Sequence, residues 1–207
     1  MFTGVSVILA HLREINSVMT KNLLFCFGLI LCTNIGFSQK NNAKEVNFKE
    51  VIWRVKAFKP EAKYLKIKAI DKKGKVYNVN AIQNSEQTSL MDVKAFVKGK
   101  RLSVKMLVAD EKYYPVKAID EEGNILDIKA ITEDGKFLPV KGVSKSGNIV
   151  HIRAIYQDMI FYNVVAISPD GNTNAVKGIK MNPDNVETTV NGIEVFAHIK
   201  SIPQVIY

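Results

Sequence analysis

Residues 116–155, VKAIDEEGNILDIKAITEDGKFLPVKGVSKSGNIVHIRAI, decide the fold because one tetrapeptide recurs in them every 12 residues. The first position of the tetrapeptide is Val or Ile, the fourth is apolar, and the third is small in every copy but the one with Met106. A fixed period of this kind indicates a repeat architecture. The copies along the chain are VKAF (55–58), IKAI (67–70), VNAI (79–82), VKAF (93–96), VKML (104–107), VKAI (116–119), IKAI (128–131), VKGV (140–143), IRAI (152–155), VVAI (164–167), VKGI (176–179) and IKSI (199–202).

The interior of one unit favours a strand over a helix. Leu126, Ile128 and Ala130 alternate with Asp127 and Lys129, which is the two-residue period of a strand. About eight residues between glycines, rich in β-branched types, are too few for a stable helix. Several connectors (DKKG, DEEG, TEDG, SKSG and SPDG) end in a glycine that suits the left-handed residue of a tight hairpin.

Strands joined by such short turns must be antiparallel neighbours, so we predict an all-β, up-and-down meander of about 12 short strands. A common buried face requires an odd-length connection, most simply a type I turn followed by a glycine bulge. A sheet of this size is expected to close as a barrel or to fold into a two-layer sandwich. A β-solenoid is the alternative fold, because a period alone does not distinguish coils from hairpins.

The alternation also predicts which side chains are buried. Three residues of each unit share the inner face: the Val or Ile, the small residue, and a large residue two places before the Val or Ile, such as Trp53. The second position of the tetrapeptide points to the outer face and is basic in ten of the twelve copies. These residues are Lys56, Lys68, Lys94, Lys105, Lys117, Lys129, Lys141, Arg153, Lys177 and Lys200.

The N-terminal part has the layout of an export signal. Residues 19–38 contain Lys21, an apolar run of about ten residues and a small-residue exit, which predicts a signal peptide and a chain beginning at Gln39. We expect translation to start at Met19, with residues 1–18 an unstructured upstream extension, residues 39–50 a polar linker and residues 51–207 a single β-repeat domain. Both cysteines lie in the leader, so the exported chain uses no disulfides; lipidation of Cys32 is an alternative that Leu31 disfavours.

The net charge of +9 and the basic outer face suggest an acidic partner. Export makes an acidic glycan or an anionic envelope surface the expected partner, and nucleic acid is not expected. No transmembrane helix is expected after the leader. Alternatively, the lysines only keep the face soluble. The candidate polyanion-binding residues are Lys68, Lys94, Lys105, Lys117, Lys129, Lys141, Arg153 and Lys177.

The other polar residues have simpler interpretations. His151 and His198 occupy the same slot of their repeats, but a third ligand with metal-site spacing is missing, so we expect ordinary exposed histidines. Paired carboxylates occur in turns, and no nucleophile motif stands out. We therefore expect no catalytic residues, no metal and no cofactor, and a non-enzymatic structural or interaction role. A small outer-membrane β-barrel is a further alternative, which the short strands and Pro203 disfavour.

The leader ending in GFSQ, the V-K-A-I units and the closing AHIKSIPQ resemble exported V-K-A-I repeat proteins of Bacteroidota-type bacteria. The resemblance covers about residues 50–207. It implies a periplasmic or extracellular location, and it implies no activity and no site residues.

Overall fold

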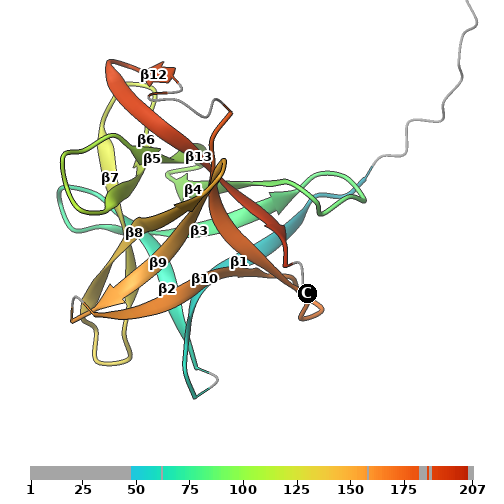
Figure 1. The fold of residues 1–207 in the computed structure, drawn as a ribbon. Coiled ribbons are helices and arrows are strands. Elements are labelled where there is room, and N and C mark those ends of the chain that lie inside the picture. The colour runs from blue at the N-terminus through green and yellow to red at the C-terminus, as the bar shows by residue number, and fades with distance from the viewer. Residues whose placement is uncertain (1–47, 62, 158, 182–185, 187, 205–207) are drawn as a thin grey trace, which may run out of the picture. The chain divides into compact units, whose positions relative to one another are not determined.

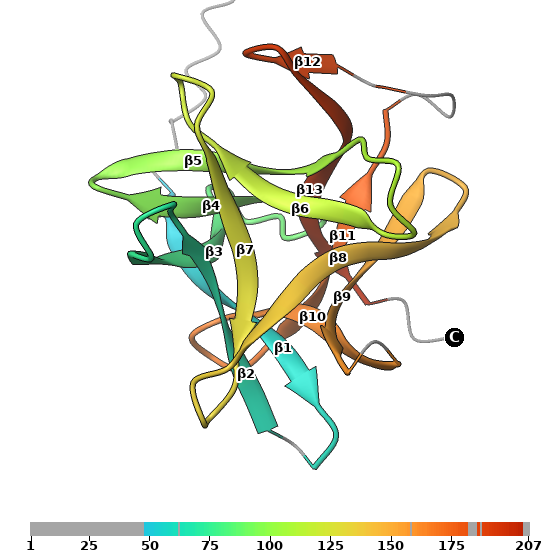
Figure 2. The same ribbon diagram turned by 90° about the vertical axis from the view of Figure 1, so that its left-hand side faces the viewer.

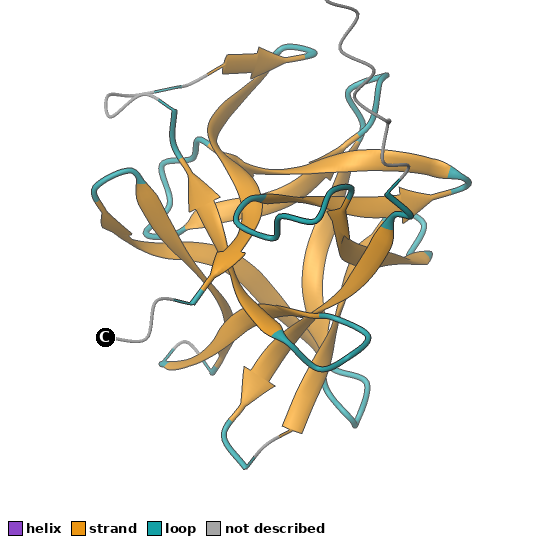
Figure 3. Cartoon of the chain, turned by 90° about the vertical axis from the view of Figure 1, so that its right-hand side faces the viewer, coloured by secondary structure: helices purple, strands orange, loops and turns teal. Residues whose placement is uncertain are grey.

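The described part of the chain is made of β-strands joined by turns and loops. The structure is a computed structural model that describes residues 48–61, 63–157, 159–181, 186 and 188–204. Within them it contains thirteen strands, all paired antiparallel in one sheet, and no helix (Figures 1 and 3). The prediction of an all-β antiparallel meander is confirmed. The predicted upstream extension and signal peptide, and linker residues 39–47, lie outside the described residues.

The strands follow the repeat one for one. The twelve tetrapeptides fall in β1 to β11 and in β13, and β12 forms a short hairpin with the start of β13. The strands are β1 (Val51–Lys59), β2 (Lys63–Ile70), β3 (Val76–Gln83), β4 (Met91–Val97), β5 (Lys100–Leu107), β6 (Tyr114–Ile119), β7 (Ile125–Ile131), β8 (Phe137–Ser146), β9 (Ile149–Tyr156), β10 (Ile160–Ile167), β11 (Thr173–Ile179), β12 (Thr188–Val190) and β13 (Ile193–Pro203).

The hairpin between β2 and β3 shows the turn geometry that the sequence predicts. The Gly74 amide donates to the carbonyl of Asp71 at 2.9 Å, and the Asp71 amide donates to the carbonyl of Lys75 at 3.1 Å. Gly74 has a φ of 78°, the left-handed conformation that closes a type I turn with a glycine bulge. The same pair of bonds and a positive-φ glycine recur at Gly123, Gly135 and Gly171.

Each of the twelve repeat strands pairs with three other repeat strands, because the two halves of one of its edges pair with different strands. The first half of β1 pairs with β3, its second half pairs with β2, and its opposite edge pairs with β10. Strand twist separates neighbours enough for a third strand to enter between them. Three strands that pair mutually in this way form what we call a junction. Junction 1 contains β1, β2 and β3; junction 2 contains β4, β5 and β13; junction 3 contains β6, β7 and β8; junction 4 contains β9, β10 and β11.

Figure 2 faces junction 3, where β6, β7 and β8 form the sides of a triangle. In the described part of the chain, each junction is linked to each of the other three junctions by one further strand pairing. Four threefold units that are each linked once to every other have the connectivity of a tetrahedron. The sheet therefore closes on itself through three-way junctions, and its antiparallel hairpins exclude the parallel coils of a solenoid. The linking pairs are β1–β10, β2–β7, β3–β4, β5–β6, β8–β9 and β11–β13.

The inner face forms one continuous core. Every Val or Ile of the first tetrapeptide position is buried, as predicted, and Trp53 is 4% exposed. The small position is occupied by eight alanines, by Gly142 and Gly178, by Ser201 and by Met106. A Cβ on Gly142 would lie 2.5 Å from Cε of Met106, and one on Gly178 would lie 2.8 Å from the same atom. The two glycines therefore make the space that Met106 fills.

Candidate functional site

The strand register gathers the outward side chains of each junction into a ring. The basic second position of one tetrapeptide lies opposite the residue two places before that position in the next strand, as Lys56 lies opposite Lys66 and Lys68 opposite Asn78. Each strand thus contributes two side chains, and each junction gathers six. The rings are Arg54, Lys56, Lys66, Lys68, Asn78 and Asn80 in junction 1; Asp92, Lys94, Ser103, Lys105, His198 and Lys200 in junction 2; Pro115, Lys117, Asp127, Lys129, Pro139 and Lys141 in junction 3; His151, Arg153, Asn163, Val165, Ala175 and Lys177 in junction 4.

The eight candidate polyanion-binding residues are distributed over all four junctions. Lys68 lies in junction 1, Lys94 and Lys105 in junction 2, Lys117, Lys129 and Lys141 in junction 3, and Arg153 and Lys177 in junction 4. The pairings between junctions place several of them directly opposite one another. These like-charged pairs are Lys68 and Lys129, Lys105 and Lys117, and Lys141 and Arg153.

Junctions 2 and 3 each contain a carboxylate that neutralises the cations beside it. In junction 3, Lys117 donates to Asp127, and the ammonium of Lys129 lies 3.7 Å from the same carboxylate. In junction 2, Lys200 donates to Asp92, and the ammonium of Lys94 lies 3.6 Å from it. Partial burial opposes ionisation of both acids, but the lysine hydrogen bonds and charges outweigh it and lower the pKa of each carboxyl.

Junction 1 gathers four cations and two carboxamides without a carboxylate. A pocket of about 410 Å³ opens at its centre, with Val55, Ile67 and Val79 among its lining residues. Partial burial lowers the pKa of Lys56, and the charges of Lys66, Lys68 and Arg54 lower it further. Within the described residues, none of the four cations has a carboxylate within ion-pair distance. Lys68 instead donates to the side-chain oxygen of Asn78.

Junction 4 is a second basic pocket, with a volume of about 560 Å³. Its ring contains Arg153, Lys177 and His151, and the Lys177 ammonium lies 2.9 Å from Nδ1 of His151. Partial burial lowers the pKa of Lys177, and the charge of Arg153 lowers it further. Burial and the charges of Lys177 and Arg153 lower the pKa of His151, so this imidazole is neutral at pH 7. The pocket thus concentrates positive charge on Arg153 and Lys177.

The two histidines that occupy the same position of their repeats lie in different junctions. His151 belongs to junction 4, and His198 belongs to junction 2, where it contacts Lys105. The structure therefore does not bring them together at one site. Among the described residues, no group of three His, Cys, Asp or Glu side chains is arranged to hold a metal ion.

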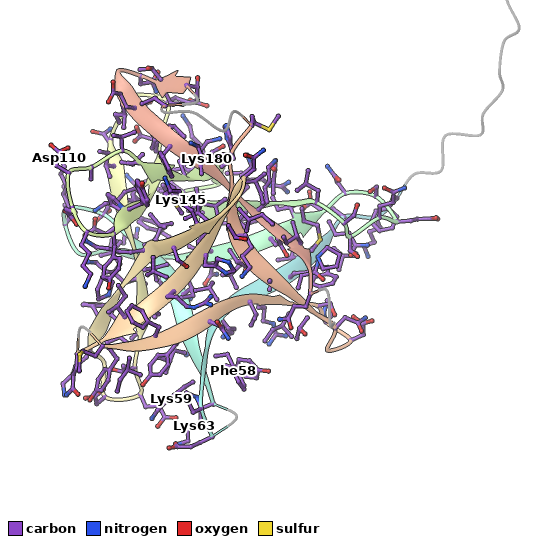
Figure 4. The ribbon with its side chains drawn as sticks, in the orientation of Figure 1. Phe58, Lys59, Lys63, Asp110, Lys145 and Lys180 are labelled. Carbon is purple, nitrogen blue, oxygen red and sulfur yellow. The ribbon has the colours of Figure 1, made fainter. Side chains whose placement is uncertain are left out.

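Several exposed lysines outside the rings are paired with carboxylates. Lys59 and Lys63, on the hairpin between β1 and β2 (Figure 4), lie 3.9 Å from Glu61 and 3.4 Å from Glu133. Lys100 lies 2.7 Å from Glu121 on the turn between β6 and β7. These carboxylates balance part of the lysine charge outside the rings, whereas the ring cations of junctions 1 and 4 have no carboxylate within ion-pair distance among the described residues.

The sequence interpretation identified only part of each ring, and in junction 1 only Lys68 was a candidate residue. Arg54, Lys66, Asn78 and Asn80 were not among the candidate residues, although they share the outer face with Lys68. The signal was present in the alternation, since each lies two residues before or at the basic position of its own strand. Their convergence depends on the pairing of β1 with β3, which the 12-residue period does not show.

The model of a family of unknown function, DUF7486, matches residues 49–202. The chain belongs to DUF7486. The DUF7486 match starts just before β1 and ends in β13, so it includes all twelve repeat strands and the four junctions. Comparison with curated proteins and with solved structures found no significant match. No helix in the described part of the chain has the length and apolar composition needed to cross a membrane.

Proposed function

We propose that this DUF7486 protein is a non-enzymatic, exported binding protein of the cell envelope, and that junctions 1 and 4 hold anionic groups of an acidic glycan or another polyanion. The observation that carries the proposal is the clustering of four cations around the pocket of junction 1 without a neutralising carboxylate among the described residues. Such a cluster favours a bound anion, because an anion relieves the repulsion between the cations.

The composition of the pockets supports binding as the role. Lysine and arginine hold anions through charge-assisted hydrogen bonds, and carboxamides such as Asn78 and Asn163 supply neutral donors beside them. The lysine stems lie in the sheet surface, and Lys56 and Lys68 are partly buried, so their ammonium groups lose less freedom on binding than those of fully exposed lysines.

The arrangement of the junctions supports a polymer as the partner. Junctions 1 and 4 are joined directly by the pairing of β1 with β10, in which Lys56 lies opposite Val165. A chain with repeated negative charges can engage both junctions at once, and simultaneous engagement raises the overall affinity above that of either site. The predicted signal peptide at residues 19–38 supports an encounter with such polymers in the periplasm or outside the cell.

The test is the salt dependence of binding to immobilised heparin, used as a sulfated glycan probe. We expect retention at low salt and a steep linear fall of log affinity with log salt. A variant with Lys56→Gln, Lys66→Gln and Lys68→Gln loses three ring cations, and we expect its slope to fall by about 3.

The matched control carries Lys72→Gln, Lys73→Gln and Lys98→Gln, three exposed lysines outside the rings, with the same change in net charge. We expect this control to keep a slope close to that of the unmodified protein. Equal losses in the two variants would mean that net charge alone drives retention, and a protein that flows through at low salt would refute the proposal.

A further inference from the structure

The four junctions share one backbone arrangement, so their equivalent slots can be compared directly. The slot two residues before the basic position holds Asp127 in junction 3, where it accepts from Lys117 of the neighbouring strand. In junction 2 the equivalent slot holds Asp92, which accepts from Lys200. In junction 1 the equivalent slots hold Arg54, Lys66 and Asn78, so this junction supplies no negative charge of its own.

From this comparison we infer that junction 1 is a binding site for a phosphate group, whose oxygens take the place that the Asp127 carboxylate has in junction 3. The inference rests on the proposed function and names the chemical group that one of its two sites selects. A carboxylate in junction 3 is held by two lysines, and junction 1 has three lysines and one arginine for the same space.

The symmetry of the ring fits a phosphomonoester. The inner, partly buried positions are Lys56, Lys68 and Asn80, one from each strand, and the outer, exposed positions are Arg54, Lys66 and Asn78. A phosphomonoester presents three terminal oxygens related by a threefold axis, so each oxygen can face one strand of the junction. Its charge of about −1.5 to −2 at pH 7 offsets much of the local excess of positive charge.

Junction 1 fits this group better than junction 4 does. All six ring positions of junction 1 carry hydrogen-bond donors, whereas two ring positions of junction 4 are Val165 and Ala175. The pocket of about 410 Å³ accommodates a phosphate and part of the group that carries it.

The test measures thermal unfolding of the protein in inorganic phosphate against sodium chloride of equal ionic strength. We expect phosphate at about ten times its dissociation constant to raise the unfolding midpoint by about 3 °C. Asn78→Asp places a carboxylate beside Lys68, and we expect this variant to lose the phosphate-dependent rise. Asn148→Asp, an exposed change of the same charge in the turn between β8 and β9, should keep it.

The reciprocal variant makes the test sharper. Asp127→Asn removes the ring carboxylate of junction 3 but leaves Lys141 paired with Glu111 and prolines at two ring positions, so we expect its phosphate response to equal that of the unmodified protein. Absence of a phosphate effect in the unmodified protein, or an unchanged effect in Asn78→Asp, would overturn the inference.

Binding of two phosphate-containing probes tests whether the phosphate group is carried by a sugar or by a lipid. Glucose 6-phosphate presents it on a sugar, and vesicles containing phosphatidic acid present it on a lipid; the one whose binding Asn78→Asp abolishes is the carrier. Retention on heparin without a phosphate response would refute the phosphate site alone. A phosphate response without retention on heparin would refute the polyanion proposal alone.

Discussion

Junctions 1 and 3 have the same strand register and different side chains at two levels. On the outside, the residue opposite a ring lysine is Asn78 on the third strand of junction 1 and Asp127 on the second strand of junction 3. On the inside, the third strand carries Ala81 in junction 1 and Gly142 in junction 3, where Met106 fills the missing volume. Because the strand register is the same in both junctions, the register depends on the pattern of the repeat. The residues that depart from this pattern determine the local packing on the inside and the local charge on the outside.

The largest expected effect concerns Met106, the one large residue at the small position of the repeat. Met106 is fully buried between Gly142 and Gly178, and Met106→Ala leaves a cavity that should lower the free energy of unfolding by about 3 kcal/mol. Gly142→Ala in the unmodified protein should lower it by about 1–2 kcal/mol, because the new Cβ overlaps the Met106 side chain. Urea denaturation measures both changes.

The two substitutions should couple. In the Met106→Ala background, Gly142→Ala restores the alanine of the other copies and fills part of the cavity, so we expect it to recover about 1 kcal/mol. The control is Ala81→Gly in junction 1, which has no methionine to release and should destabilise in either background. Additive effects of Met106→Ala and Gly142→Ala would contradict the packing described here.

The inner face was the part of the fold that the sequence predicted best. Val55, Ala57 and the turn glycine Gly74 each follow from a local rule: a two-residue period fixes the face, and the conformation of a turn fixes the glycine. The three-way junctions did not follow, because the pairing of β1 with β3 and β10 joins residues far apart in sequence. The rings were therefore only partly identified: Lys68 was a candidate and its neighbour Asn78 was not.

A smaller effect comes from the same inner column in junction 2. Ser201 is fully buried, and its hydroxyl has no hydrogen-bond partner among the described residues, whereas junction 1 has alanine at all three equivalent positions. Ser201→Ala removes an unsatisfied polar group without leaving a large cavity. We expect the free energy of unfolding to rise by about 1 kcal/mol, measured as a higher urea midpoint with an unchanged slope. A lower midpoint would mean that the hydroxyl is satisfied in the folded protein.

The smallest expected effect is a pH dependence of stability that Asp127 gives to junction 3 and that Asn78 does not give to junction 1. Although partial burial opposes ionisation, the hydrogen bond from Lys117 and the charges of Lys117 and Lys129 hold the pKa of Asp127 below its usual 3.8. An acid whose pKa is lower in the folded state stabilises the protein above its unfolded pKa, and this contribution is lost as the pH falls through the folded pKa. The Asp127 carboxylate is 43% exposed, so we expect a contribution of about 0.5 kcal/mol at pH 7.

Urea midpoints of the unmodified protein and of Asp127→Asn should therefore differ at pH 7 and converge as the pH is lowered from about 5 to below 3. Asn78→Asp in junction 1 should show the opposite pattern, with a midpoint above that of the unmodified protein at pH 7 and the same convergence in acid. An unchanged midpoint of Asn78→Asp at pH 7 would mean that repulsion between the cations of junction 1 does not measurably destabilise the protein. The proposed electrostatic difference between junctions 1 and 3 would then be wrong.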